Sequence, residues 1–139
     1  MTSKQQIHGH FLQLLQDKID VFRDRISALT DDAKNDAKGS AGDKHETALS
    51  MMHIEQEKTN YKLQEFLAQF EILRKIDSRV ITTKIVLGSL IQVNKIWLYV
   101  SVALPKSTIN NESIFAISQD SPLAKKMLGQ IGLGFIFGK

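Results

Sequence analysis

The chain contains no cysteine, and only two of its 139 residues are proline. Without thiols, a disulfide framework, a thiolate metal site and a cysteine nucleophile are all excluded. No apolar run approaches the roughly 20 residues that a membrane-spanning helix needs, and residues 1–6 lead into no signal-peptide core. The sequence therefore predicts an intracellular, cytoplasmic protein without a membrane span.

Acidic and basic residues are unevenly distributed, although the hydrophobic (42%) and charged (24%) fractions are those of a folded protein. Residues 1–76 contain 11 Lys or Arg and 12 Asp or Glu, a net charge of −1. Residues 77–139 contain 7 and 3, a net charge of +4. A basic second part suits an acidic partner surface. A solvated surface explains the same excess, so both interpretations stay open.

Two long stretches of the first part carry apolar residues at the alternating spacing of three and four that is typical of coiled coils. Each stretch predicts a helix of about 28 residues, which would be about 42 Å long. Gln56 and Thr59 interrupt the second seam, and we expect them to weaken it locally. The first seam consists of Ile7, Phe11, Leu15, Ile19, Phe22, Ile26 and Leu29, and the second of Leu49, Met52, Gln56, Thr59, Leu63, Phe66, Phe70 and Leu73.

Residues 33–42 separate the two seams and include two glycines but no large apolar residue. We expect the chain to reverse there, so that residues 1–76 form an antiparallel two-helix coiled-coil hairpin with its tip near residues 33–46. A parallel coiled-coil dimer is the alternative. The intramolecular hairpin is favoured, because closing a short loop costs little entropy, and we therefore expect a monomer.

From Ile85 onward the apolar period changes from about 3.5 to 2, which is typical of strands. Asn94 and Lys95 predict a tight turn between two of these strands, and residues 106–112 predict a polar loop. Both faces of the second strand carry apolar residues, so we expect both to be covered. The expected strands are residues 87–93, 96–104, 114–118 and 131–137.

A short helix is predicted between the last two strands. Ser121 is suited to the N-cap, Pro122 to the first helical position and Gly129 to the position after the end. The fold class is therefore α+β. A helical hairpin at residues 1–76 precedes a small antiparallel sheet domain with one short helix at residues 77–139.

This architecture and two local motifs resemble those of the bacterial Gre transcript-cleavage factors. Residues 117–124, I-S-Q-D-S-P-L-A, followed by Leu128-Gly129, are similar to a helix start of that family. Residues 42–48, G-D-K-H-E-T-A, are similar to the family's coiled-coil tip, and Gly88-Ser89 matches a pair common there. The resemblance covers nearly the whole chain, and it implies an FKBP-like fold for the second domain.

The resemblance implies a transcription elongation factor that docks on bacterial RNA polymerase through its C-terminal domain and inserts the hairpin tip into the secondary channel. Asp43 and Glu46 occupy the positions of the family's catalytic acidic pair. In the family, this pair helps to hold Mg²⁺ at the polymerase active site when the 3′ end of backtracked RNA enters the channel. The protein would not itself be an enzyme, because the polymerase performs the hydrolysis. DNA would be contacted only indirectly.

The residue types at the tip suit this chemistry. Mg²⁺ prefers hard oxygen ligands, usually one or two carboxylates with waters and phosphate oxygens. Positions i and i+3 of a helix share a face, so Asp43 and Glu46 could address one ion. Two-metal hydrolysis uses one ion for the attacking oxygen and one for the leaving oxygen. We expect the isolated protein to bind no metal stably and to be inert.

The tip also departs from the family pattern. Lys44 replaces an apolar residue, Thr47 replaces an asparagine, and Leu49-Ser50 replaces a Glu-Tyr pair. These changes leave open a second function, that of a non-cleaving secondary-channel regulator or inhibitor of the polymerase. Asp43 and Glu46 also fit a D-x-x-E capping box, in which they would only stabilise the start of a helix.

Parts of the sequence also fit other functional classes. The seams alone would suit a structural adaptor that dimerises, and an FKBP-like fold alone would suit a prolyl isomerase, although no aromatic-lined proline pocket is recognisable. His8 and His10 lie two positions apart, on different faces of a helix, so no shared metal is expected. Lys84, Lys125 and Lys126 would either meet the polymerase or nucleic acid, or remain solvated.

Overall fold

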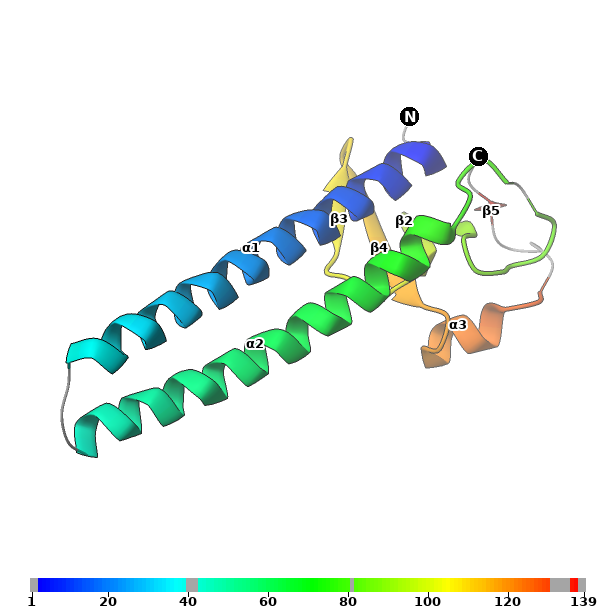
Figure 1. Cartoon of the computed structure of the whole chain (residues 1–139). Helices are drawn as coiled ribbons and strands as arrows, with labels where there is room; N and C mark the ends of the chain where they lie inside the picture. Colours follow the sequence, from blue (N-terminus) through cyan, green and yellow to red (C-terminus); the bar gives the residue numbers. More distant parts are fainter. Residues whose placement is uncertain (1–2, 40–42, 81, 131–135, 138–139) are drawn as a thin grey trace. The chain divides into compact units, whose positions relative to one another are not determined.

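The computed structural model of the chain describes residues 3–39, 43–80, 82–130 and 136–137, with the backbone alone for 32–39, 43–48 and 136–137. The fold is α+β, with two long helices before a small sheet and a short helix (Figure 1). The elements are α1 (Lys4–Gly39), α2 (Asp43–Lys75), β1 (Leu90–Val93), β2 (Ile96–Ser101), β3 (Ser107–Ile109), β4 (Glu112–Ser118), α3 (Pro122–Met127) and β5 (Ile136–Phe137).

Contacts along the chain define two compact units. The sheet unit consists of residues 1–13 and 69–139, and the helical unit consists of residues 14–68. Each unit includes residues from both long helices, whereas we expected the domains to meet between residues 76 and 77. That boundary stays a prediction.

The sheet has the strand order β3-β4-β2-β1-β5 and is mixed. β1 pairs with β2 antiparallel, with Val93 opposite Ile96 across the tight turn. Asn94 in that turn has a φ of 57°, a left-handed conformation that asparagine tolerates. β2 and β4, however, run parallel, with Leu98 opposite Phe115. The expectation of a purely antiparallel sheet was therefore wrong.

The strand β3 explains this difference. It lies within residues 106–112, which we expected to be a polar loop, and it pairs antiparallel with β4. Asn110 and Asn111 connect the two strands with φ angles of 51° and 65°, the positive values that a two-residue hairpin turn requires. Because each hairpin reverses the chain, overlooking β3 inverted the expected direction of β4.

β1 and β2 are shorter than expected, whereas β4 begins two residues before the expected segment 114–118. β1 and β2 occupy four and six residues of the expected segments 87–93 and 96–104. Beyond Ser101 the chain leaves the strand, although the Leu104 N–H still donates to the Ala116 carbonyl at 3.3 Å. Of the expected strand 131–137, residues 131–135 lie outside the described residues, and β5 pairs antiparallel with β1.

The short helix α3 begins where the sequence predicted. Ser121 is extended, and its hydroxyl oxygen accepts a hydrogen bond from the Ala124 N–H at 3.2 Å. Pro122 occupies the first turn, where its missing N–H leaves no bond unmade. The Leu128 N–H donates to the Ala124 carbonyl at 2.8 Å, and Gly129 follows with a φ of 82°. Local capping chemistry therefore defines both ends of the helix.

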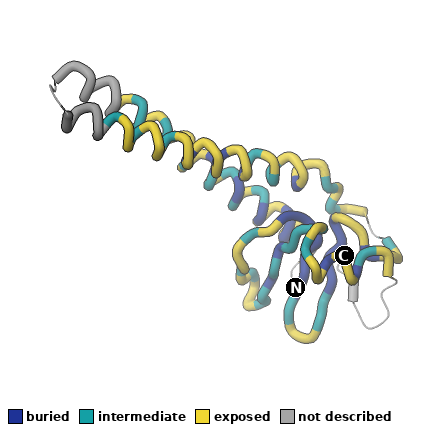
Figure 2. The backbone as a smooth tube through the Cα atoms, turned by 90° about the horizontal axis from the view of Figure 1, so that it is seen from below, coloured by how far each residue is buried: buried dark blue, intermediate teal, exposed yellow. Residues whose placement is uncertain are grey.

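The core of the sheet unit uses both faces of β2. On one face, Leu98 and Val100 pack in a cluster with Ile91 and Met127. On the other face, the ring of Tyr99 stacks on Phe11 with centroids 6.4 Å apart. Figure 2 shows the buried residues in dark blue gathered along the central strands. Both faces of this strand are therefore covered, as its apolar pattern predicted.

The helical unit is held by the two predicted seams. No seam residue whose side chain is described is exposed, and the rings of Phe22 and Phe66 meet edge to face at 5.2 Å. The Gln56 amide donates to the Thr30 hydroxyl at 3.0 Å, and that hydroxyl donates to the Ile26 carbonyl. The Gln56 amide therefore has a hydrogen-bond partner, and the expected local weakening at Gln56 and Thr59 stays a prediction.

The helix α1 is longer than expected. It continues through residues 33–38 and ends at Gly39, although this stretch was expected to belong to a loop. The segment lacks large apolar residues, but alanine and lysine have high helix propensity. The loss of the seam therefore does not end the helix, and residues 40–42 lie outside the described residues.

Candidate functional site

The two predicted site residues lie at the start of α2. Asp43 is the first residue of this helix and Glu46 stands three positions later. This is the spacing on which the predicted carboxylate pair depends. Their side chains lie outside the described residues, so their roles as metal ligands or as a capping box both remain predictions.

The donor chemistry of the pair fits Mg²⁺. Two carboxylates three positions apart on a helix would offer hard oxygen ligands, and Mg²⁺ usually takes its remaining ligands from water and phosphate. Among the residues whose side chains are described, no group of three or more His, Asp or Glu could hold a metal ion.

The two units differ strongly in charge. The sheet unit contains ten Lys or Arg and four Asp or Glu, a net charge of +6, while the helical unit contains eight and eleven, a net charge of −3. The difference in net charge between these two units is larger than the difference between residues 1–76 and residues 77–139. A basic unit favours an acidic partner surface, and an acidic unit favours bound cations.

Segment 117–124 is partly exposed in the sheet unit, although Ala124 is buried. The hydroxyl of Ser118 accepts a hydrogen bond from the Asp120 N–H at 3.1 Å, which orders the turn before α3. This turn borders a hollow of about 160 Å³, in which the Gln69 amide donates to the Ala103 carbonyl at 2.9 Å. Asp120 is exposed beside this hollow.

Three of the lysines singled out from the sequence lie on the exposed surface of the sheet unit. Lys125 and Lys126 lie on α3 and are exposed, as is Lys84. Their exposure is consistent with either interpretation given above, a partner contact or a solvated surface.

A second group of polar residues in the sheet unit was not singled out from the sequence. Lys4, only 5% exposed, donates from Nζ to the Val80 carbonyl at 2.9 Å. Burial lowers the pKa of this amine, and the negative charge of Asp77 opposes that shift. Lys4 precedes Ile7 by three positions and so extends the apolar seam backward. That spacing could have indicated its burial.

His8 and Tyr99 form a buried pair next to this lysine. The Nδ1 atom of His8 lies 2.7 Å from the phenolic oxygen of Tyr99, and burial raises the pKa of that phenol. Burial, and then the positive charge of Lys4, lower the pKa of His8, while Asp77 acts in the opposite direction. The imidazole therefore favours its neutral form.

The carboxylate of Asp77 is engaged by a single arginine. It accepts hydrogen bonds from the backbone N–H and the Nε of Arg79, at 3.0 and 3.1 Å. The bonds from the side chain, and then from the backbone, hold the pKa of Asp77 below its usual value. Asp77 is therefore only a partial counter-ion for Lys4.

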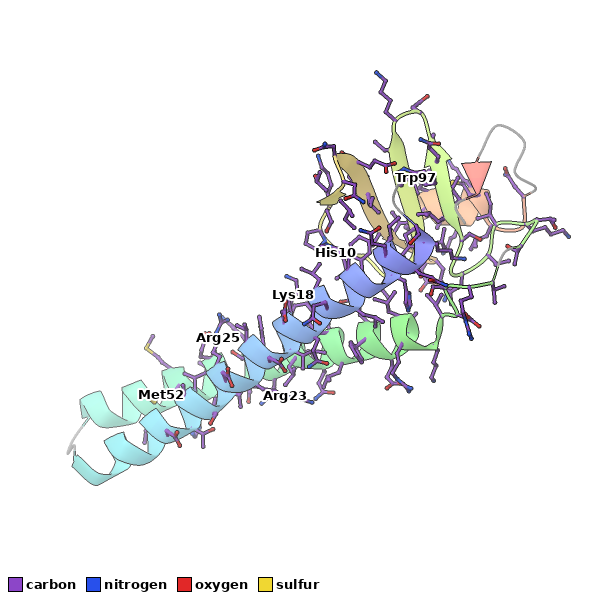
Figure 3. The ribbon with its side chains drawn as sticks, turned by 90° about the horizontal axis from the view of Figure 1, so that it is seen from above. His10, Lys18, Arg23, Arg25, Met52 and Trp97 are labelled. Atoms are coloured by element: carbon purple, nitrogen blue, oxygen red, sulfur yellow. The ribbon has the colours of Figure 1, made fainter. Side chains whose placement is uncertain are left out.

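Figure 3 labels His10 and Trp97, and each of them has a hydrogen-bond partner. The Nε2 atom of His10 lies 3.0 Å from the Ser107 hydroxyl, and the Trp97 indole donates to Glu112. Trp97 is buried in β2. His8 and His10 have different hydrogen-bond partners.

Comparison with known proteins adds no family. No family model, no curated protein and no solved structure matches this chain.

Among the described residues, no helix combines the length and the apolar character needed to cross a membrane.

Proposed function

We propose that this protein is a Gre-like transcription elongation factor of bacterial RNA polymerase. Its sheet unit would dock on the polymerase, and the acidic end of its helical unit would enter the secondary channel and stimulate cleavage of backtracked RNA. The observation that carries this proposal is the placement of the D-x-x-E pair in the first turn of the second long helix, on a chain that also has the capped S-P-L helix. The protein would act in the cytoplasm.

The contacts in the helical unit support an antiparallel coiled-coil hairpin. Phe22 contacts Phe66, and Thr30 is bonded to Gln56, so residue numbers rise along one helix as they fall along the other. A hairpin of this register brings the start of α2 to the turn between the helices. Asp43 and Glu46 would then be presented at the tip, while the sheet unit would be the FKBP-like domain.

The charge of each unit suits its proposed role. The helical unit, at −3, would approach an active site that holds metal ions and is therefore attractive to carboxylates. The sheet unit, at +6, would dock on an acidic rim. Because exposed charges are screened by salt, binding should weaken as ionic strength rises.

The role of the acidic pair is to position rather than to react. Asp43 and Glu46 would offer carboxylate oxygens at the channel end of the protein, and Mg²⁺, when bound there with the polymerase, would stabilise charge at the reacting phosphate. The pair is an incomplete ligand set by itself, since Mg²⁺ needs about six ligands. The protein would therefore stimulate the polymerase, and it would have no enzymatic activity when isolated.

The substitutions at the tip favour a second candidate function. Lys44 adds a positive charge between the two carboxylates in sequence, and Thr47 stands where the family has asparagine. A protein that binds the polymerase but positions no metal would occupy the channel without stimulating cleavage. Such a regulator would still dock on the polymerase, but it would not stimulate RNA cleavage.

Binding of the full chain to bacterial core RNA polymerase tests the docking step common to both functions. We expect binding at micromolar concentration, weakened by salt and by Lys125→Glu combined with Lys126→Glu. Lys95→Glu combined with Lys106→Glu is the control, because it makes the same charge change elsewhere on the exposed surface of the sheet unit. No binding at micromolar concentration would contradict the proposal.

A further inference from the structure

A pocket of about 240 Å³ lies within the sheet unit, between the ends of the long helices and residues 77–89. Its rim gathers exposed apolar side chains, each 36–49% exposed. The other exposed large apolar side chains of the described residues do not line it. The apolar rim residues are Ile72, Val80, Val86 and Leu87.

The size of the pocket indicates what it can take. Pockets for small molecules usually have volumes of about 300–1,000 Å³, and this one is smaller. It has room for one large apolar side chain. Protein interfaces often bury one such anchor in a pocket surrounded by contacts that exclude water. The pocket is therefore better suited to an anchoring side chain than to a whole cofactor.

The polar groups that line the pocket leave a positive charge facing it. Among the described residues, Lys4 Nζ donates to one acceptor, the Val80 carbonyl, although an ammonium group has three donors. The carboxylate of Asp77 is held by Arg79. Lys75 also lines the pocket and is only 4.0 Å from Glu71, at the limit of an ion pair. A carboxylate bound in this pocket would therefore accept hydrogen bonds from Lys4 and Lys75.

One wall of the pocket is fixed before any partner arrives. Gly88 has a φ of 95°, and a Cβ at this position would lie 2.8 Å from Ile76 Cγ2. Its N–H donates to the Val100 carbonyl at 2.7 Å, and the Ser89 hydroxyl accepts from the Val86 N–H at 2.9 Å. A preformed wall reduces the ordering cost of binding.

We infer that this pocket docks a segment of a partner protein that presents a large apolar side chain next to a carboxylate. The apolar side chain fills the pocket, and the carboxylate accepts hydrogen bonds from Lys4 at the wall and from Lys75 at the rim. The apolar lining supplies the affinity, and Lys4, which Asp77 compensates only in part, supplies the preference for an acidic segment. This inference does not depend on the proposed polymerase function, and its test uses no polymerase.

Titration of the labelled full chain with three short peptides tests the inference by NMR. The peptides are Ac-Gly-Asp-Phe-Gly-amide, its Asn-Phe analogue and its Asp-Ala analogue. We expect saturable shifts for the first peptide, centred on the backbone amides of residues 75–77 and 86–89. The Asn-Phe peptide lacks the carboxylate and the Asp-Ala peptide lacks the ring, so each should bind about tenfold more weakly than the first peptide. Equal shifts with all three peptides, shifts centred elsewhere, or no shift at millimolar peptide would overturn the inference.

Variants of the full chain separate the pocket from general charge. Lys4→Met keeps the length of the side chain and should remove the preference for the aspartate peptide. Leu87→Asp places a negative charge on the exposed rim and should abolish binding. Leu123→Asp is the control, since Leu123 is a similarly exposed residue on α3 that does not line the pocket. Equal losses in Leu87→Asp and Leu123→Asp, both folded, would also overturn the inference.

Discussion

The Nδ1 atom of His8, on α1, lies 2.7 Å from the phenolic oxygen of Tyr99, on β2. Both residues are buried, and they are 91 positions apart in the chain. The rings of Tyr99 and Phe11 also stack, so this pair joins the first turns of α1 to one face of the sheet. A buried polar pair of this kind stabilises only while both partners are present.

Replacing Tyr99 by phenylalanine should therefore lower the free energy of unfolding. The change keeps the ring and removes the hydroxyl, leaving the buried His8 without this partner at a cost of about 1–3 kcal/mol. Chemical denaturation measures the effect. Tyr61→Phe is the matched control, because Tyr61 is 81% exposed and its hydroxyl can bond to water. Equal unfolding free energies for Tyr99→Phe and the wild type would contradict the account.

The same pair predicts how stability depends on pH. Burial lowers the pKa of His8 in the folded chain, and Lys4 lowers it further against the opposing effect of Asp77. Between the folded pKa and the unfolded value of about 6.5, the unfolded chain binds more protons. Stability should therefore fall as pH decreases through this window.

Unfolding free energies at about pH 7.5 and about pH 5.5 measure this dependence. His8→Gln should reduce the loss of stability on acidification, because it removes the titrating group. His53→Gln should retain it, because His53 is exposed on α2. A wild type that gains stability on acidification, or a His8→Gln variant with an unchanged slope, would show that His8 does not act in this way.

Three glycines provide a graded test of the backbone. Gly9 lies within α1 with open space around it, so Gly9→Ala should stabilise the chain by about 0.5–1 kcal/mol. Gly129→Ala should cost about 1–2 kcal/mol, because φ is 82° there without a steric contact. Gly88→Ala should cost more, because the methyl group also meets the β-branched Ile76. Melting temperatures in any other order would contradict this reading.

Features that depend on neighbouring residues could be predicted from the sequence. The seams follow from apolar spacing, and every seam position whose side chain is described is at least partly buried. The start of α3 follows from Ser121 and Pro122, whose roles are local capping chemistry. The turn at Asn94 likewise lies between two strands that pair directly.

Features that depend on distant residues could not be predicted in the same way. β3 is a short edge strand with two polar residues, so its only clear sign was the pair Asn110-Asn111. Because β3 was not expected, the parallel pairing of β2 with β4 could not be predicted. The burial of Lys4 depends on Val80, which is 76 positions away. Spacing places Lys4 on the seam, but it does not identify the acceptor of its hydrogen bond.

RNA cleavage in a stalled, backtracked elongation complex of bacterial RNA polymerase tests the central claim most directly. The wild type, Asp43→Ala/Glu46→Ala and the charge-matched control Asp24→Ala/Glu57→Ala would be compared at equal occupancy of the polymerase. We predict stimulated cleavage by the wild type and the control, and its loss in the Asp43/Glu46 variant. Cleavage that persists in that variant would contradict the assigned acidic pair, and binding without any stimulation would establish a channel-occupying regulator instead.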